Sequence, residues 1–340
     1  MSAGKLTESY LTRRCHRRFL MTVMRVLAIA CLGCTTSWLT TLSKSLATGS
    51  SYAYWPPVVL VTAEVLKAAI SLAMLCWEKY PEVSIIANAT CSPPPRSSII
   101  RLAGLAVLYA LQNNLLFAAM THVNLATYHV LISLRIPLTA WLMHVALKRD
   151  FSKRQYGAIV CLVVGAVSSQ VDIRQLFSSS NDLSQVFTVT PSGLFYMLVS
   201  VICASVASVV NEYMLKDEAI GSLHAQNFLL YSWGSFINAI LLGPRALFLV
   251  NSAGSLALYR GFNCFTWALV ASLTCLGLVT SAILKYADNM IRSLGYVGSI
   301  VMASAVTSFC LGTALTPSFA IGAGLSCAGI WMYMVDSEAF

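Results

Sequence analysis

Long runs without a charged residue dominate the chain, and short polar segments separate them. The runs comprise Val26–Ser43, Leu102–Leu134, Leu183–Asn211, Ala219–Pro244, Gly261–Leu284 and Ser293–Val335. A helix needs about 20 apolar residues to cross a bilayer, so the longest runs contain two crossings each. The pattern therefore predicts an all-α membrane protein.

The polar segments divide these runs into ten predicted transmembrane helices. Their approximate positions are 24–46, 55–77, 99–120, 125–147, 155–171, 192–215, 223–242, 265–286 and two within 293–335, which a turn near 313–317 separates. An even number of crossings leaves both termini on one side of the membrane. Lysine and arginine gather in the N-terminal segment and at Lys148–Arg154, which places that side in the cytosol.

Each predicted half has five crossings, an odd number, so two halves of one fold would insert upside down relative to each other. This is the inverted-repeat plan of many secondary transporters, whose site lies near the membrane midplane. The predicted organisation is a cytosolic basic arm (1–22), a first five-helix half (23–171), a lumenal loop (172–190), a second five-helix half (191–336) and a short cytosolic tail (337–340).

Composition agrees with a membrane protein, since 57% of the residues are hydrophobic and only 10% are charged. The net charge of +9 could suggest a nucleic-acid partner. However, the basic residues flank predicted cytosolic ends and lack the aromatic-basic pattern of a nucleic-acid binder. Most of the eleven cysteines lie within apolar runs, so we expect small buried hydrophobes and no metal site.

Polar side chains interrupt the apolar pattern between residues 109 and 135. Tyr109, Gln112 and Asn113 fall at i, i+3 and i+4 and share one face of a predicted helix. Tyr128 and Arg135 share a face of the next helix. Buried amides and guanidiniums need partners in hydrocarbon, so these faces either hold helices together or line a ligand cavity.

Arg135 favours the ligand cavity. An arginine at the centre of a membrane helix costs about 2.5–3.5 kcal/mol, and an anionic ligand would offset that cost. Pro137 cannot donate to the carbonyl of Ser133, so we expect the helix to bend or open beside Arg135. Broken helices next to a polar site are typical of secondary transporters.

Other polar residues within the predicted helices are also candidates for structural or functional roles. Glu64 and Lys67 could neutralise each other on one helix or take part in gating. Asn227 and Tyr231 share a face that could line a cavity. Lys285 lies near a helix end and could extend to the membrane interface or pair with Asp288.

Five segments, in order and spacing, resemble those of the Golgi nucleotide-sugar transporters of the CMP-sialic acid and UDP-galactose/UDP-N-acetylglucosamine type. They are YALQNNL from Tyr109, TYHV from Thr127 with LRI from Leu134 and TA from Thr139, EYMLK from Glu212, QNFLLY from Gln226 and KYADN from Lys285. Each segment is weak alone, but five in this order are specific for the family. The resemblance covers roughly residues 22–335.

The resemblance implies a ten-helix drug/metabolite-transporter fold and an antiporter. Such a protein moves a pyrimidine nucleotide sugar, a UDP-sugar or CMP-sialic acid, into the Golgi lumen in exchange for the nucleoside monophosphate; the endoplasmic reticulum stays open as the location. The residues implied around the nucleoside are Tyr109, Asn113, Tyr128, Asn227 and Tyr231. The basic residues implied at the phosphate are Arg135 and Lys285, which would be unpaired in an empty cavity and so favour exchange.

Sugar contacts or gating roles are expected at a further set of residues. They are Glu64, Lys67, Gln112, Ser208, Asn211 and Glu212. The chain departs from the family at Ser133 and Arg135, where Gln and Lys are usual, and at His129, where Gln is common. These departures lie where the sugar should sit, so they bear on which sugar is carried.

Other functions stay open on the sequence. A non-transporting membrane scaffold or a generic metabolite exporter could share the fold. A membrane glycosyltransferase would need an Asp-x-Asp metal site, which the sequence lacks, so we expect neither an enzyme nor a metal or cofactor. A GDP-sugar carrier is disfavoured because the Gly-x-Leu-Asn-Lys stretch of that branch is not found. The expected partners are the two nucleotides and the lipid bilayer, and a homodimer is left open.

Overall fold

The computed structural model describes residues 3–45, 52–79, 96–123, 125–170, 190–217, 222–311 and 316–337. Every regular element within these ranges is a helix, which confirms the predicted all-α class. The predicted lumenal loop 172–190 lies outside the described residues except for Thr190, and the predicted tail lies outside them beyond Ser337.

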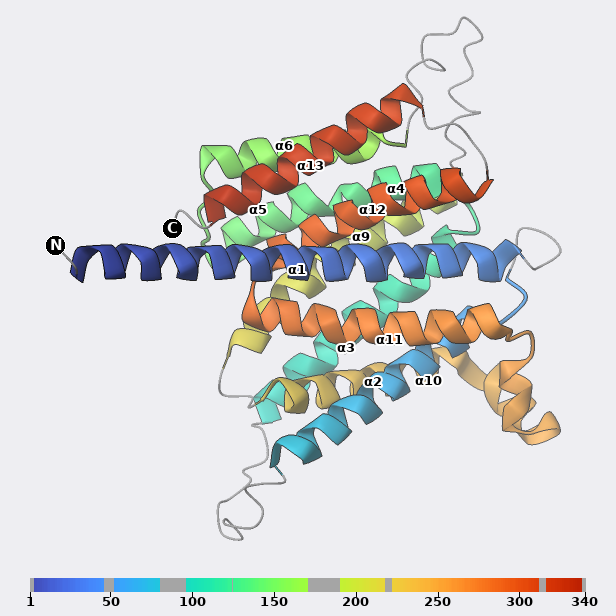
Figure 1. Ribbon diagram of the computed structural model, residues 1–340. Helices are drawn as coiled ribbons and strands as arrows, with labels where there is room; N and C mark the ends of the chain where they lie inside the picture. The colour runs from blue at the N-terminus through green and yellow to red at the C-terminus, as the bar shows by residue number, and fades with distance from the viewer. Residues whose placement is uncertain are drawn as a thin grey trace, which may run out of the picture.

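The described residues form eleven α-helices and one short 3₁₀ helix (Figure 1). In chain order they are α1 (Ala3–Ser45), α2 (Pro56–Lys79), α3 (Arg96–Ala119), α4 (Leu125–Ser133), α5 (Arg135–Leu147), α6 (Lys153–Ser168), α9 (Pro191–Lys216), α10 (Leu223–Ala253), η2 (Ser255–Tyr259), α11 (Cys264–Tyr286), α12 (Asn289–Leu311) and α13 (Pro317–Ser337). The basic segment predicted at 1–22 is therefore the helical start of α1 from Ala3 onward.

Eight segments of the described chain are long and apolar enough to cross a membrane. They lie in α1, α2, α3, α9, α11, α12 and α13 and in the α4–α5 region, where Thr127–Leu147 counts as one segment. The 16-residue α6 and the 31-residue α10, which is broken at Gly243, are not among the eight. The chain is a multi-pass membrane protein.

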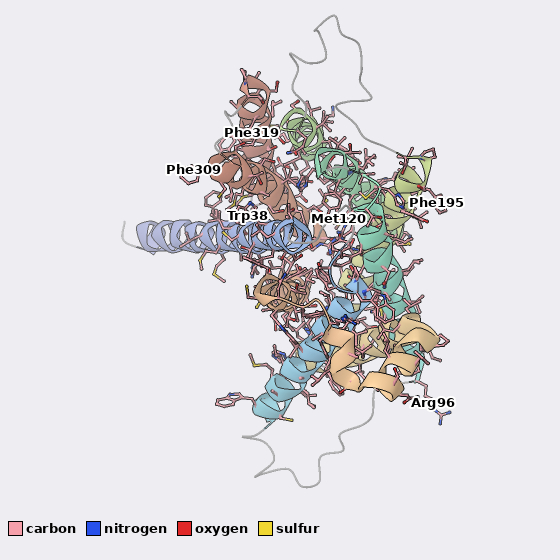
Figure 2. All side chains as sticks on the ribbon, turned by 90° about the vertical axis from the view of Figure 1, so that its right-hand side faces the viewer. Trp38, Arg96, Met120, Phe195, Phe309 and Phe319 are labelled. Carbon is pink, nitrogen blue, oxygen red and sulfur yellow. The ribbon has the colours of Figure 1, made fainter. Side chains whose placement is uncertain are left out.

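Large apolar side chains cover the outside of the bundle. Phe195 and Phe309 project away from the neighbouring helices (Figure 2), and Phe309 is 89% exposed. In water such a surface would drive association, whereas lipid tails solvate it as well as protein does.

Helices from the two halves of the chain pair with one another. α1 packs against α11 and α12, α2 against α10 and α11, α3 against α9 and α10, and α6 against α13 (Figure 1). The approach of α6 to α13 needs Gly165, because a Cβ atom there would lie 2.7 Å from the backbone nitrogen of Ser326. The halves therefore interlock and do not form two separate bundles.

The chain is broken between α4 and α5, as predicted beside Arg135. α4 ends at Ser133 and α5 begins at Arg135, with Leu134 between them. Pro137, in the first turn of α5, has no N–H, so the Ser133 carbonyl loses the donor four residues on. The break places Arg135 at the start of a helix, partway along the segment Thr127–Leu147.

Candidate functional site

A cavity lies inside the bundle between helices from both halves. Side chains of α1, α2, α3, α9, α10, α11, α12 and the α4–α5 region line it. It reaches from Arg292, in the first turn of α12, to Phe117 near the end of α3. The Phe117 ring centroid lies 5.6 Å from that of Tyr52, which follows the end of α1 in the chain. The cavity thus extends from the start of α12 toward the end of the bundle where α1 ends.

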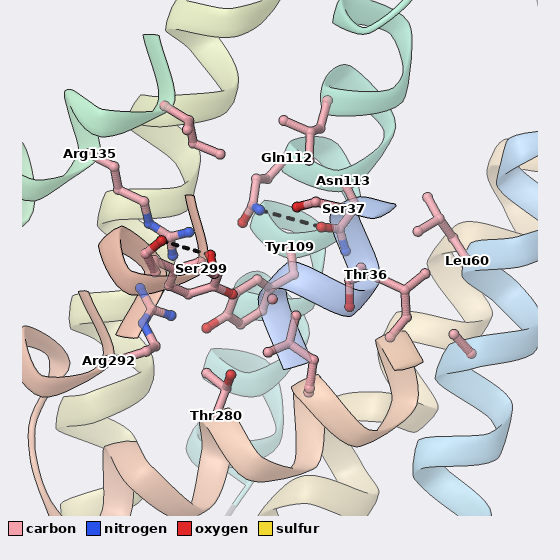
Figure 3. A pocket seen from close by; sticks show the side chains of 18 of the residues that line it. Thr36, Ser37, Leu60, Tyr109, Gln112, Asn113, Arg135, Thr280, Arg292 and Ser299 are labelled. Carbon is pink, nitrogen blue, oxygen red and sulfur yellow. Dashed lines mark hydrogen bonds between the residues drawn. The ribbon is translucent and has the colours of Figure 1, made fainter. Parts of the chain in front are cut away.

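Two arginines converge at one end of this cavity. Arg135 starts α5, and Arg292 lies in the first turn of α12 with only 2% of its surface exposed. Their Cζ atoms lie 5.5 Å and 5.8 Å, respectively, from the centroid of the Tyr296 ring. Figure 3 shows the two guanidinium groups pointing toward each other.

Both guanidiniums are short of partners. Arg135 Nη2 donates to the carbonyl oxygen of Ala204 at 3.3 Å. Within the described residues neither arginine makes an ion pair, and Nε of each arginine and Nη2 of Arg292 have no hydrogen-bond acceptor. Unpaired charges are costly away from water, and two like charges also repel. This end of the cavity is therefore suited to an anion with more than one charged oxygen.

Aromatic and amide side chains form the wall beside the arginines. The Tyr109 hydroxyl accepts a hydrogen bond from Asn211 Nδ2 at 3.0 Å, which fixes the ring at the cavity surface. Gln112 Nε2 donates to Asn113 Oδ1 at 3.4 Å (Figure 3), and Tyr128 also lines the cavity. Aromatic rings can stack on a planar heterocycle, and the amides can meet the donors and acceptors on its edge.

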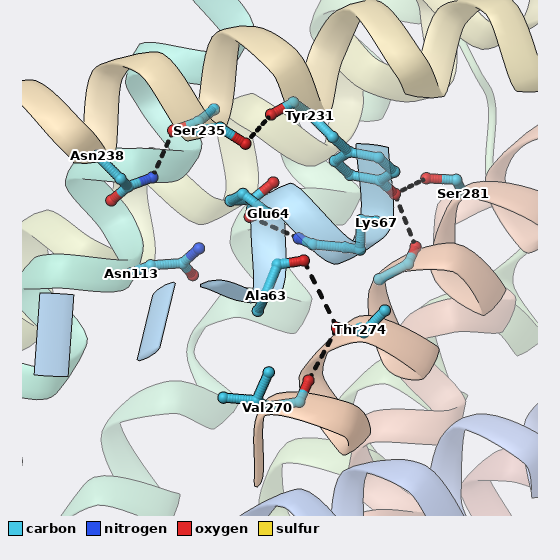
Figure 4. Close-up of polar contacts among 12 residues, drawn as sticks. Ala63, Glu64, Lys67, Asn113, Tyr231, Ser235, Asn238, Val270, Thr274 and Ser281 are labelled. Carbon is cyan, nitrogen blue, oxygen red and sulfur yellow. Dashed lines mark hydrogen bonds and ion pairs between the residues drawn. The ribbon is translucent and has the colours of Figure 1, made fainter. Parts of the chain in front are cut away.

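An ion pair lies further along the cavity. Lys67 Nζ is 2.5 Å from Glu64 Oε1 and 4.6 Å from the centroid of the Tyr231 ring (Figure 4). A Cβ atom on Gly277 would lie 2.7 Å from Lys67 Cδ, and one on Gly234 would lie 3.0 Å from Glu64 Oε2. The two glycines therefore leave the space that the pair occupies, and the pair neutralises its own charge.

The Tyr231 ring that supports this pair is itself held in place. Its hydroxyl donates to the carbonyl oxygen of Gly277 at 3.1 Å and lies 2.8 Å from Ser281 Oγ. Tyr231 is only 5% exposed, so the ring joins α10 to α11 beneath the ammonium group of Lys67.

The structure brings nine of the thirteen predicted site residues together in the cavity lining. They are Glu64, Lys67, Tyr109, Gln112, Asn113, Tyr128, Arg135, Asn211 and Tyr231. The other four, Ser208, Glu212, Asn227 and Lys285, do not line it. The cavity lining therefore adds no support to their predicted roles.

These four residues lie at different places in the fold. Asn227 is buried on α10, and Lys285 lies in the last turn of α11. Ser208 and Glu212 each accept a hydrogen bond from Asn289 at the start of α12.

Arg292 and Tyr296 were not found from the sequence. The last apolar run begins at Ser293, so an arginine just before it is interpreted as a loop residue. In the structure α12 begins at Asn289, which puts Arg292 and Tyr296 one turn apart on one face of the helix. Extending the helical pattern one turn upstream of Ser293 would have placed Arg292 on the same face as Tyr296, which already lies within the predicted run.

Known proteins resemble the chain over most of its length. A family model described as nucleotide-sugar transporter matches residues 20–334. CMP-sialic acid transporter 5 of Oryza sativa subsp. japonica is 29% identical over 276 residues, which cover 80% of this chain and 66%, just under two thirds, of that protein. CMP-sialic acid transporter 1 of the same plant is 27% identical and covers 87% and 89% of the two chains. CMP-sialic acid transporter 1 of Arabidopsis thaliana is 31% identical and covers 75% and 72%.

One crystal structure shares the arrangement of the helices. It aligns with 92% of this chain and 96% of its own chain with a TM-score of 0.61. Its sequence is 13% identical, so this likeness concerns the fold alone.

Proposed function

The chain belongs to the nucleotide-sugar transporter family, and we propose that it is an antiporter that exchanges a pyrimidine nucleotide sugar for the nucleoside monophosphate. In this proposal the nucleotide sugar moves from the cytosol into the Golgi lumen and the monophosphate returns. The protein changes the location of its substrate and not its covalent structure. The pair of buried arginines at Tyr296 carries the proposal.

The charge of this pair matches the ligands of such an exchange. A phosphate monoester carries about 1.5 to 2 negative charges at pH 7. Arginine binds phosphate oxygens through two parallel N–H groups, so Arg135 and Arg292 together can neutralise one monophosphate or a diphosphate. A neutral or cationic metabolite would leave both guanidiniums unpaired, which disfavours a generic metabolite exporter.

The cavity lining suggests a role for each group of residues. We assign the phosphate to Arg135 and Arg292 and the nucleoside to the wall that contains Tyr109, Asn113 and Tyr128. Lys285, which the family resemblance assigns to the phosphate, lies outside the lining, so Arg292 supplies the second charge in this proposal.

Exchange follows from the cost of an empty cavity. Without a ligand, the two guanidiniums lie buried, unpaired and close to each other, and occlusion of the cavity would make their repulsion worse. Either nucleotide neutralises them. The loaded carrier therefore passes through the occluded state more easily than the empty one, and the two ligands exchange without a separate energy source.

We further propose ten transmembrane helices in two inverted halves, with both termini in the cytosol and α6 and α10 as the two additional crossings. The half boundaries are those of the sequence prediction, 23–171 and 191–336. The helix contacts support this arrangement. An inverted repeat relates each helix to the one five crossings earlier or later in the chain. Under this relation the contact α1·α12 corresponds to α5·α9, α3·α9 to α1·α11, and α2·α11 to α3·α10. The contacts α2·α10 and α6·α13 each correspond to themselves, and all of these helix pairs are in contact.

The names of the relatives support a pyrimidine substrate, since they are called CMP-sialic acid transporters. UDP-sugars remain in the proposed class because the sequence motifs also resemble UDP-sugar transporters. The Golgi membrane rests on the same resemblance, with the endoplasmic reticulum as the alternative, and a homodimer stays a prediction.

Exchange in proteoliposomes tests the proposal. Vesicles that are empty or preloaded with UMP, CMP or GMP are given labelled UMP or CMP outside. We expect uptake into UMP- or CMP-loaded vesicles to exceed uptake into empty or GMP-loaded vesicles many-fold. Equal uptake in all four would refute exchange. A chain that neither transports nor melts at a higher temperature with any of the nucleotides would be a non-transporting scaffold.

A further inference from the structure

A second polar cluster lies next to the cavity, where α12 begins. Arg149, in the link between α5 and α6, donates from Nη2 to Asp288 Oδ2 at 2.9 Å and lies 3.5 Å from the Tyr333 hydroxyl. Asp288 Oδ1 accepts a hydrogen bond from the backbone N–H of Ile291 at 2.8 Å and so caps α12. One carboxylate therefore joins the α5–α6 link to the first turn of α12.

Glu212 holds the same helix end from α9. Its Oε2 accepts a hydrogen bond from the backbone N–H of Asn289 at 3.1 Å, while its Oε1 forms an ion pair with Lys216 Nζ at 2.6 Å. Asn289 Nδ2 in turn donates to Ser208 Oγ at 2.9 Å. Asn289 is fully buried, so the first residue of α12 is enclosed by these contacts.

We call this cluster the α12 latch, and it consists of Arg149, Glu212, Asp288 and Asn289. It adjoins the cavity at the end where the two arginines lie. Asn211, the neighbour of Glu212, lines the cavity, as does Arg292, three residues after Asn289. The opposite end of the cavity reaches Phe117, near the end of α1. The latch therefore lies at the α12 end of the cavity, away from the end near Phe117.

The α12 latch contains an ion pair, Arg149 with Asp288, and in general apolar packing is often as stable as a buried ion pair. The Arg149 and Asp288 side chains are 30% and 14% exposed. Burial by itself lowers the pKa of Arg149, but Asp288 and Tyr333 beside it outweigh burial and raise the pKa overall, so the guanidinium stays charged. Buried ion pairs add little net stability over apolar contacts, and their best attested use is to select one state among alternatives.

We propose that the α12 latch is the closure of the cavity on this side, and that it is coupled to the bound anion through Arg292. Asp288 and Glu212 are positioning residues, because they fix the helix turn that carries Arg292. An anion that binds Arg292 displaces this turn, Arg149 separates from Asp288, and the cavity opens on the side where α12 begins. The coupling to a nucleotide rests on the proposed function, whereas the closure itself does not.

Cysteine accessibility tests the closure in the full chain reconstituted into vesicles. Ser293→Cys is the reporter, since Ser293 lines the cavity beside the latch and is 4% exposed. A membrane-impermeant maleimide is added outside, and its reaction is measured over that of the same chain without Ser293→Cys. A protease-sensitive tag after α13 identifies vesicles with the latch side outward, because Ser152, beside the α5–α6 link, donates a hydrogen bond to Asp336 near the end of α13.

Two variants break the latch without removing a helix cap. Asp288→Asn loses the charge but keeps an oxygen that can cap α12, and Arg149→Gln removes the partner charge. We expect each to raise labelling from the latch side several-fold. The double variant should raise it no further, because both changes act through one contact. Asp150→Asn is the matched control, a carboxylate in the same link that is 94% exposed, and it should label at the parent rate.

Coupling to the ligand has a separate readout. In Asp288→Asn, uptake of UMP or CMP into empty vesicles should rise relative to uptake into preloaded ones, because closure no longer depends on the ligand. Unchanged labelling from the latch side in both single variants, at an unchanged melting temperature, would overturn the closure. If the latch variants show raised labelling but the chain exchanges no nucleotide, the closure is supported, whereas the proposed function and its coupling to the closure are refuted.

Discussion

The replacement Arg292→Gln separates a ligand-binding arginine from a structural one, because the two roles predict opposite changes in the empty protein. Arg292 is 2% exposed, and its surroundings leave its charge unpaired. Its Nε and Nη2 atoms lack acceptors within the described chain, and the guanidinium of Arg135 approaches the same Tyr296 ring. Glutamine keeps a polar end and removes the charge. The empty protein should therefore become more stable, while the nucleotide complex becomes weaker.

The size of both effects follows from the geometry. With Cζ atoms 5.5 Å and 5.8 Å from one ring centroid, the guanidiniums are at most about 11 Å apart. At an effective dielectric constant of about 20, their repulsion is at least about 1.5 kcal/mol, and this cost disappears in Arg292→Gln. Loss of a charge-assisted hydrogen bond to phosphate costs about 1.5–3 kcal/mol, which corresponds to roughly a tenfold to 150-fold rise in Kd.

Thermal unfolding with and without UMP or CMP, together with Kd by calorimetry, measures both quantities. Arg292→Lys keeps the charge and should keep the lower melting temperature of the empty parent, with an intermediate Kd. Arg154→Gln, an exposed arginine in the first turn of α6, should change neither quantity. The reasoning is refuted if Arg292→Gln melts below the parent when empty and binds the nucleotides with the parent Kd.

Two other substitutions probe the ion pair and the helix break. Gly277→Ala would place a Cβ atom 2.7 Å from Lys67 Cδ and should abolish most exchange with insertion intact, whereas Gly104→Ala, with no atom within 4 Å, should exchange at the parent rate. Equal exchange by both variants would show that the position of Lys67 is unimportant. Pro137→Ala restores a donor to the α4–α5 segment and should displace Arg135, raising the Kd for UMP or CMP roughly tenfold, or by about 1.4 kcal/mol, without lowering the melting temperature. A Kd equal to that of the parent would mean that the break does not position the arginine.

Much of the architecture could be predicted because lipid imposes simple rules on sequence. Uncharged runs of about 20 residues identify the class, since water-exposed helices do not need them. The break at Arg135 was predictable because Pro137 lacks the backbone N–H that would donate to the carbonyl oxygen of Ser133. The pairing of Glu64 with Lys67 was predictable because it is local to one turn of one helix.

Features that depend on distant segments were not predictable in this way. Arg292 looked like a loop residue, and only the start of α12 at Asn289 places it inside a helix and opposite Arg135. Likewise, no local pattern shows that Gly277 must stay small, because the atom it accommodates belongs to Lys67, more than two hundred positions earlier in the chain. Such residues are specified by the packing of helices that are far apart in sequence.

The ion pair of α2 also affects how the chain enters the membrane during synthesis. Glu64 and Lys67 are three residues apart, so they meet as soon as one turn of α2 has formed, before α10 and α11 exist. The insertion machinery therefore meets a nearly neutral helix in place of one with two free charges, each of which costs about 2.5–3.5 kcal/mol. Arg135 has no acidic residue within α5, so its segment enters the bilayer with a full charge. Its retention there depends on the helices that are translated after it.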